Sequence, residues 1–160
     1  MKRSFRALAV LPVVAVMAAC ASSGGGGQST YTRDLGRQLV PTLEEARLKM
    51  WNKHNWALAR EQVESQNIYW ESSWREFDPP VGAAVTGPED ARLRILIRGR
   101  RVAGELDGGA LYRTTFVGEY QVRGGMYDEW TPMAPPREAQ QVFQQVLGDI
   151  ELEIRTGVRR

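Results

Sequence analysis

The sequence predicts an α+β domain in which one helix, four antiparallel strands and a long C-terminal helix follow one another. Three patterns support this prediction: a capping box that opens an apolar helical repeat near residue 42, alternating apolar and polar residues between 56 and 122, and a broad apolar stripe from 139 to 154. Strands grouped between two helices are typical of an antiparallel sheet with a helix packed on one face.

The first helix is expected to begin at Thr42, because Thr42 and Glu45 have the spacing of a capping box. The apolar residues that follow recur at the spacing of one helical face. They are Leu43, Ala46, Met50 and Trp51. The helix is expected to end between residues 52 and 55.

Two strands are expected after this helix. The first is short and runs from 56 to 61, where Trp56, Leu58 and Arg60 alternate with Ala57, Ala59 and Glu61. The second runs from 68 to 75 and stops before Asp78 and two prolines, because proline cannot donate to a sheet. Its period of two places four residues on one face, namely Ile68, Trp70, Ser72 and Trp74.

Two further strands are expected beyond a loop rich in glycine, alanine and proline. The third strand runs from 92 to 98, with Leu93, Ile95 and Ile97 pointing inward and the arginines pointing outward. The fourth runs from 112 to 122 after a turn at 107–109. Gly118 falls on its apolar side, which predicts a bulge or a close approach of another element.

The C-terminal helix follows Pro135 and Pro136, which suit a first helical turn, and Gly157 is a plausible stop. Its apolar stripe is broad enough to cover one face of the sheet. The stripe consists of Ala139, Val142, Phe143, Val146, Leu147, Ile150 and Ile154. The sequence therefore predicts a single α+β domain over residues 41–157.

Residues 1–19 have the composition of an export signal. Lys2, Arg3 and Arg6 precede an uncharged apolar run that is too short to span a membrane and ends in small residues. The 21 Lys and Arg residues include these three, so 18 basic and 19 acidic residues follow the signal, a net charge of −1. A nucleic-acid partner is therefore not expected, despite the basic isoelectric point of the whole chain.

The residues Val16-Met17-Ala18-Ala19-Cys20 resemble the lipobox of bacterial lipoproteins, with Met17 where leucine is most usual. The resemblance implies a diacylglyceryl thioether on Cys20 and a third acyl chain on its amino group, and two or more chains give a stable anchor. Ala21, in place of aspartate, implies the outer membrane, with the domain facing the periplasm. The alternative is an ordinary signal cut after Ala19, which would leave a free thiol.

Residues 20–40 are expected to form the lipidated cysteine and a flexible tether. The segment 21–30 is rich in glycine and serine and has no apolar side chain larger than alanine. A flexible chain of about 20 residues spans roughly 25 Å on average. The tether is therefore expected to hold the domain clear of the lipid headgroups.

The order of elements resembles the helix-grip domains of BamC-type lipoproteins, which are accessory to the β-barrel assembly machinery. The resemblance rests on a first helix, then the segments 55–58 and 68–74, an arginine-alternating strand and a closing amphipathic helix. It covers most of residues 41–154 but includes no signature motif. It implies a helix-grip-like fold, and it transfers no functional residue.

The residues that carry chemistry favour a protein without catalytic activity. His54 is the single histidine, so a metal site or a nucleophile and base pair has no second imidazole, and Cys20 is assigned to lipid. Asp149, Glu151 and Glu153 lie on the polar side of the last helix, as solvated residues do. We therefore expect no enzyme activity, no metal and no cofactor, and an enzyme that uses His54 is the rival hypothesis.

Two features are candidates for binding. Trp70, Trp74 and Phe143 could line an apolar cavity under the long helix, or they could simply fill the core. The outward arginines of the third strand could contact a partner or a membrane, or they could form an ordinary solvated face. These arginines are Arg92, Arg94, Arg98, Arg100 and Arg101.

The sequence as a whole predicts a membrane-anchored lipoprotein that acts as a non-enzymatic binding or assembly accessory in the cell envelope. Its expected partners are the membrane, through acylated Cys20, and an envelope protein. The alternative is a carrier or sensor that holds an apolar ligand between helix and sheet. A large cavity between helix and sheet would favour the carrier, and a filled core would favour the partner-binding protein.

Overall fold

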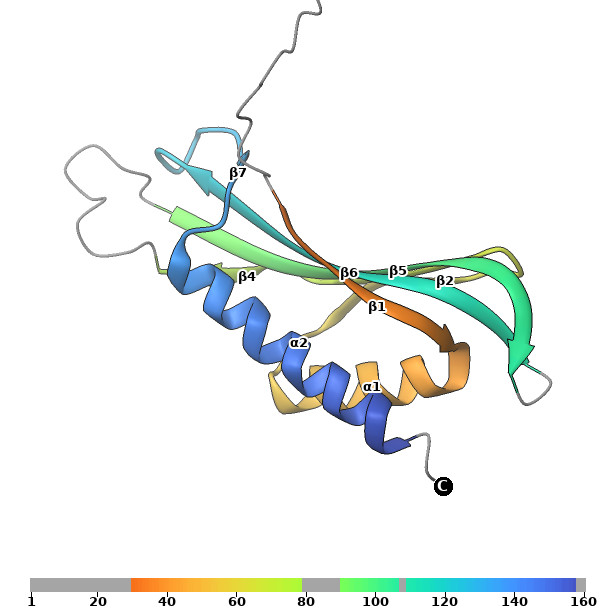
Figure 1. The fold of residues 1–160 in the computed structure, drawn as a ribbon. Coiled ribbons are helices and arrows are strands. Elements are labelled where there is room, and N and C mark those ends of the chain that lie inside the picture. The colour runs from red at the N-terminus through yellow and green to blue at the C-terminus, as the bar shows by residue number, and fades with distance from the viewer. Residues whose placement is uncertain (1–29, 79–89, 107–108, 158–160) are drawn as a thin grey trace, which may run out of the picture.

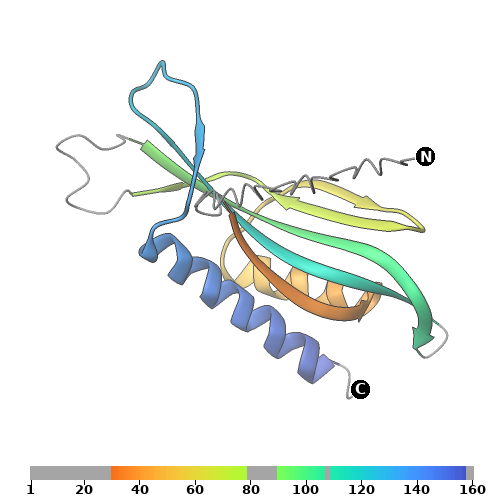
Figure 2. The ribbon, with the colours of Figure 1, turned by 45° about the horizontal axis from the view of Figure 1, so that its top comes forward.

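The computed structural model describes residues 30–78, 90–106 and 109–157. The predicted export signal, Cys20 and the first part of the predicted tether lie outside these residues. The described chain forms one curved antiparallel sheet with two helices on one of its faces (Figures 1 and 2). This confirms the predicted α+β class, with an antiparallel sheet and a C-terminal helix. Within the described residues, no helix is long and apolar enough to cross a membrane.

The elements follow in the order β1, α1, β2 to β7 and α2. Their bounds are β1 Thr30–Leu39, α1 Val40–Lys53, β2 Leu58–Val63, β3 Asn67–Ser72, β4 Arg75–Phe77, β5 Asp90–Leu106, β6 Gly109–Arg123, β7 Thr131–Met133 and α2 Arg137–Gly157. The main sheet order is β1-β6-β5-β3-β2, with β4 added to the edge of β5 and β7 to the edge of β6.

The sheet has seven strands, and the prediction of four was therefore wrong. Two of the additional strands, β4 and β7, contain three residues each, which is too few for a periodic pattern to be visible. The predicted second strand ends at Ser72, and β4 begins only after a break at Ser73 and Trp74.

The third additional strand is β1, which occupies residues assigned to the tether. Thr30–Leu39 pairs with β6 from Glu119 to Leu111, so the folded domain begins at Thr30 and not at residue 41. Only Tyr31 and Leu35 are buried in β1, because it lies at an edge of the sheet, and its sequence therefore looks polar. A bulge at Leu35, with Gly36 at φ +79°, further interrupts the alternation.

The first helix starts two residues before its predicted beginning. Leu39 is the N-cap of α1 and makes no side-chain cap hydrogen bond, so the expected capping box at Thr42 does not start the helix. Pro41 lies in the first turn, where its fixed φ suits a helix and its missing N–H costs nothing. Strand β1 therefore continues into α1 with no loop between them.

The core lies between the sheet and the two helices. Leu43 and Met50 of α1 and Phe143 of α2 are fully buried against Trp70 and Phe116 of the sheet. Phe143 lies directly over Gly118, where an added Cβ atom would be 2.6 Å from two of the ring carbons. Gly118 is therefore the point of close approach that the sequence suggested.

Candidate functional site

Both helices of the described residues lie on one face of the sheet, and within those residues the other face, called here the helix-free face, carries no helix (Figure 2). The alternation along β5 decides which side chains reach this helix-free face. Leu93, Ile95 and Ile97 are fully buried on the helix side, so the arginines that alternate with them along the strand point to the helix-free face, as the sequence predicted; these are Arg92, Arg94, Arg98 and Arg100. Arg101 is paired with Tyr112, which belongs to the core on the helix side, so its grouping with the outward arginines was wrong. The outward arginines do not form one uniform surface, because their neighbours on β3 and β6 differ along the strand.

Arg92 is enclosed by two indole rings near the start of β5. Its guanidinium carbon is 4.3 Å from the ring centroid of Trp74 and 4.1 Å from that of Trp130. Its Nη2 also donates a hydrogen bond of 2.6 Å to the side-chain oxygen of Gln121. Burial lowers the pKa of the Arg92 guanidinium from its ordinary value. Arg92 is therefore committed to stacking and hydrogen bonding within the domain.

Arg94 forms the centre of an ion-pair network that joins three strands. Its Nε donates to Glu119 of β6 at 2.6 Å, and its Nη1 donates to Glu71 of β3. Tyr69 donates a hydrogen bond of 2.5 Å to the other oxygen of Glu71, and burial raises the pKa of this hydroxyl, which keeps it a donor. Trp74 covers the guanidinium at 4.4 Å. Arg94 thus holds β3, β5 and β6 together and is not free to bind a partner.

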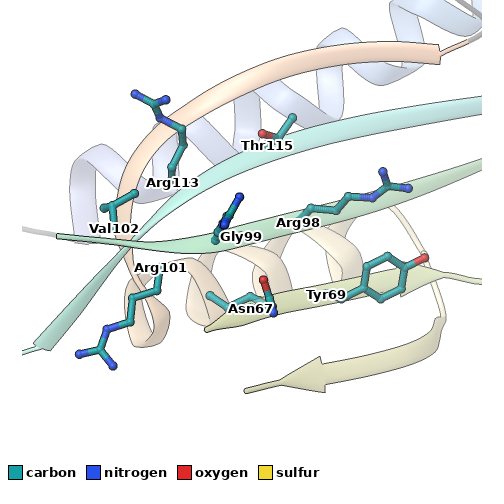
Figure 3. Close-up of a pocket in the computed structure, with 10 residues that line it drawn as sticks. Asn67, Tyr69, Arg98, Gly99, Arg101, Val102, Arg113 and Thr115 are labelled. Carbon is teal, nitrogen blue, oxygen red and sulfur yellow. The ribbon is translucent and has the colours of Figure 1, made fainter. Parts of the chain in front are cut away.

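A basic groove lies farther along the same face, where β5 approaches its bend. It has a volume of about 690 Å³, and its lining includes Tyr69, Arg98, Arg100, Arg113 and Thr115 (Figure 3). The side chain of Arg98 is 54% exposed, and its ion pair with Glu119 is long, at 4.0 Å. We refer to Arg98, Arg100 and Arg113, with Tyr69 and Thr115, as the basic groove.

The register of the sheet places like charges opposite each other beside this groove. Arg100 of β5 lies opposite Arg113 of β6, and Arg113 lies opposite Arg37 of β1. Within residues 30–78, 90–106 and 109–157, none of these three arginines forms a salt bridge. Like charges directly opposite in a sheet are destabilising, so this row works against the stability of the fold. The arginines are nevertheless available to an anionic partner.

The structure separates the three residues predicted to line an apolar cavity. Trp70 and Phe143 are fully buried in the core. Trp74 follows the end of β3 and lies on the helix-free face, against Arg92 and Arg94. The prediction that it shares a face with Trp70 was wrong, because the strand ends at Ser72 and the alternation does not continue past it. These residues therefore fill the core and brace the outer face.

Arg47 of α1 is a buried charge that the apolar periodicity of this helix does not predict. It is 2% exposed, its guanidinium carbon is 4.9 Å from the ring centroid of Trp70, and its Nη2 is 3.7 Å from Glu61 of β2. Its Nε has no hydrogen-bond partner within the described part of the chain. In the sequence, the position of Arg47 between the apolar residues of the helix could have indicated burial. Only the packing of α1 against β2 and β3 buries the side chain.

His54 is at the C-terminal end of α1 and links the two helices. Its Nε2 is 2.6 Å from Asp149 of α2, and Lys53 pairs with the same carboxylate at 2.9 Å. The hydrogen bonds from Lys53 and then from His54 lower the pKa of Asp149. This contact joins the C-terminal end of α1 to α2. In the described ranges, no group of three or more His, Cys, Asp or Glu side chains is placed to hold a metal ion.

Comparisons with known proteins identify no family. No family model matches the chain, and no curated protein does. Among solved structures, the chain is similar to the conserved protein YugN of Geobacillus kaustophilus HTA426, which is itself described as uncharacterised. The two chains are 15% identical with a TM-score of 0.43, over 78% of this chain and 90% of that one.

Proposed function

We propose that this protein is a lipid-anchored, non-enzymatic binding accessory of the cell envelope that holds an anionic partner in its basic groove. The anchor is the acylated Cys20, which resembles a lipobox cysteine, and the proposed location is the outer membrane with the domain in the periplasm. The observation that carries the proposal is the row of Arg37, Arg113 and Arg100, whose charges oppose one another across the sheet.

The arginines along β5 have different surroundings, and this difference supports the basic groove as the binding site. Arg92 and Arg94 have partners within the domain, and their charges are used for packing and ion pairing. Arg100 and Arg113 have no acidic partner in the described residues. They lie opposite each other, and the repulsion between their like charges destabilises the sheet. An acidic surface of a second envelope protein would offset that repulsion, and planar guanidinium groups suit carboxylates because they bind them in a bidentate manner.

Because of the anchor, a weak contact between the basic groove and its partner would be enough for binding. Nine residues separate Cys20 from Thr30, the first residue of β1. A short linker between two binding elements gives an effective concentration of the order of millimolar. A groove of modest affinity would then be occupied, provided that the partner lies in or near the same membrane.

The fold is compatible with the helix-grip-like architecture of BamC-type lipoproteins, which we propose as its structural class. The support is the long α2 lying across one face of a curved antiparallel sheet (Figure 1). The helix–sheet interface is filled by fully buried side chains such as Phe143 and Trp70. This packing gives no support to the alternative of a carrier with an apolar ligand in that position.

The variant Arg113→Glu in the anchored protein tests the proposal. It converts two like-charged cross-strand pairs into two oppositely charged pairs, each contributing roughly 0.2–1 kcal/mol, so thermal stability should be kept or raised. Function, measured as complementation of a deletion strain and as co-purification of an envelope protein from detergent-solubilised membranes, should nevertheless be lost. Arg137→Glu, at an exposed arginine on the helix side, is the matched control and should be functional.

Two results would contradict the proposal. Full complementation by a stable Arg113→Glu protein would show that the basic groove has no role. Complementation by the unanchored Cys20→Ser protein, abolished by His54→Ala, would instead indicate catalysis, because an enzyme would not need its anchor to turn over substrate.

A further inference from the structure

The hairpin between β6 and β7 exposes two large apolar side chains at its tip. Tyr127 is 96% exposed and Met126 is 73% exposed, the two highest values among the large hydrophobic residues in the described ranges. The loop that carries them is braced from within. Arg123 donates to the carbonyl oxygen of Met126 at 3.2 Å, and the N–H of Asp128 donates to the carbonyl of Gly125 at 3.0 Å. The two side chains are thus held away from the domain by an ordered turn.

The chain enters the folded domain at the base of the same hairpin. Thr30 of β1 lies opposite Glu119 of β6, and Met133 of β7 lies opposite Tyr120. Both strands occupy the same edge of β6, because β5 occupies the other edge along its whole length. Figure 1 shows β7 beside the start of β1. Thr30, the first described residue, therefore lies next to Met133, which is itself 48% exposed.

The distances agree with a membrane contact at this end of the domain. The β6 strand continues from Glu119 to Arg123, about 13 Å at the rise of a strand, and the tip lies just beyond. Ten residue steps lead from Cys20 to Thr30, and a flexible chain of that length spans about 17 Å on average. The basic groove lies in the opposite direction, because Arg113 is about 20 Å from Glu119 along β6.

We propose that Met126 and Tyr127 insert into the interfacial region of the lipid bilayer that holds the acyl chains of Cys20. The proposal rests on the acylation of Cys20 in the proposed function. Tyrosine suits this depth because its ring is apolar and its hydroxyl remains hydrated, and methionine adds a flexible apolar side chain. The neighbouring Asp128 and Glu129 are acidic and exposed, so the contact is apolar and needs no anionic lipid. Insertion of the tip turns the basic groove away from the membrane, toward a protein partner.

A fluorescent label near the tip tests this contact in the mature acylated protein. Its Cys20 sulfur is blocked by lipid, so Glu129→Cys provides one free thiol for an environment-sensitive dye, and Ala103→Cys at the far end of β5 provides the control. In phosphatidylcholine vesicles, nitroxide lipids should quench the label at 129 several-fold more than the label at 103. Serine at both 126 and 127 should reduce the quenching at 129 to the level of the control, and high salt should have no effect.

The possible failures are distinguishable. Mass spectrometry of the mature protein tests the anchor. A protein without acyl chains would refute the proposed anchor, and with it the proposed function, independently of where the side chains of the tip lie. An acylated, vesicle-bound protein whose label at 129 is as accessible to aqueous iodide as the label at 103 would overturn the tip contact alone. Shielding that requires anionic lipid and disappears in high salt would also overturn it, since the basic groove would then face the membrane. Shielding in native membranes but not in lipid vesicles would overturn it in favour of a protein contact.

Discussion

The substitution Gly118→Ala tests how closely α2 approaches the sheet. The new methyl group would lie 2.6 to 2.7 Å from three ring carbons of Phe143, whereas carbon atoms in contact are ordinarily about 3.5–4.0 Å apart. The ring is fully buried, and protein interiors are close-packed, so we expect α2 to shift by about 1 Å. Overpacking of this kind costs about 1–3 kcal/mol of folding free energy.

The double variant Gly118→Ala with Phe143→Ala should separate this steric conflict from general damage. Phe143→Ala alone should cost about 3–5 kcal/mol, because it removes a fully buried ring. In the double variant the methyl group meets a cavity and no ring, so it should add no further loss. The two substitutions should therefore be non-additive, with a coupling energy of about 1–3 kcal/mol.

Urea unfolding of the unacylated domain, followed by circular dichroism, measures these free energies. All strand pairings and the core described here lie within residues 30–157, so this domain contains the interactions concerned. Gly148→Ala is the matched control, since Gly148 lies in α2 with open space around it, and the change should stabilise the domain by about 0.5–1 kcal/mol. Additive losses from Gly118→Ala and Phe143→Ala, or a neutral Gly118→Ala, would refute the packing described for α2.

Three further predictions concern the anchor, the helix pair and the buried arginine. Cys20→Ser should remove the acyl chains, so the protein should leave the membrane fraction, and retention in high salt would mean that lipid on Cys20 is not the anchor. Asp149 has a pKa below its ordinary value of 3.8, so its contribution to stability is present above that pH and is lost as the pH falls through the lowered pKa. Asp149→Asn should therefore lower the melting temperature at neutral pH, and the difference from wild type should shrink in acid; a constant difference across the pH range would contradict this. Arg47→Met should stay within about 1.5 kcal/mol of wild type in urea unfolding, because methionine keeps the packing and Glu61 is 39% exposed and can be hydrated, whereas a loss of 3–5 kcal/mol would indicate an essential buried pair.

The sequence by itself determined the features that depend on local periodicity and on chemistry at one position. The α+β class, the C-terminal helix, the alternation of β5 and the close approach at Gly118 could be predicted because a buried face repeats every two or 3.6 residues. Cys20 as an acylation site is likewise a prediction from local residues, and it lies outside the described part of the chain.

Only the tertiary structure decided which residues meet across the sheet. Strand β1 escaped prediction because an edge strand buries few side chains, and its pairing energy comes from backbone groups that every residue has. Arg94 and Arg100 look alike in the sequence, but Arg94 meets Glu71 and Glu119, whereas Arg100 meets Arg113. The register between distant strands makes this difference. The alternation of side chains along a strand fixes the face on which each residue lies, but it does not fix which residue of the neighbouring strand lies opposite.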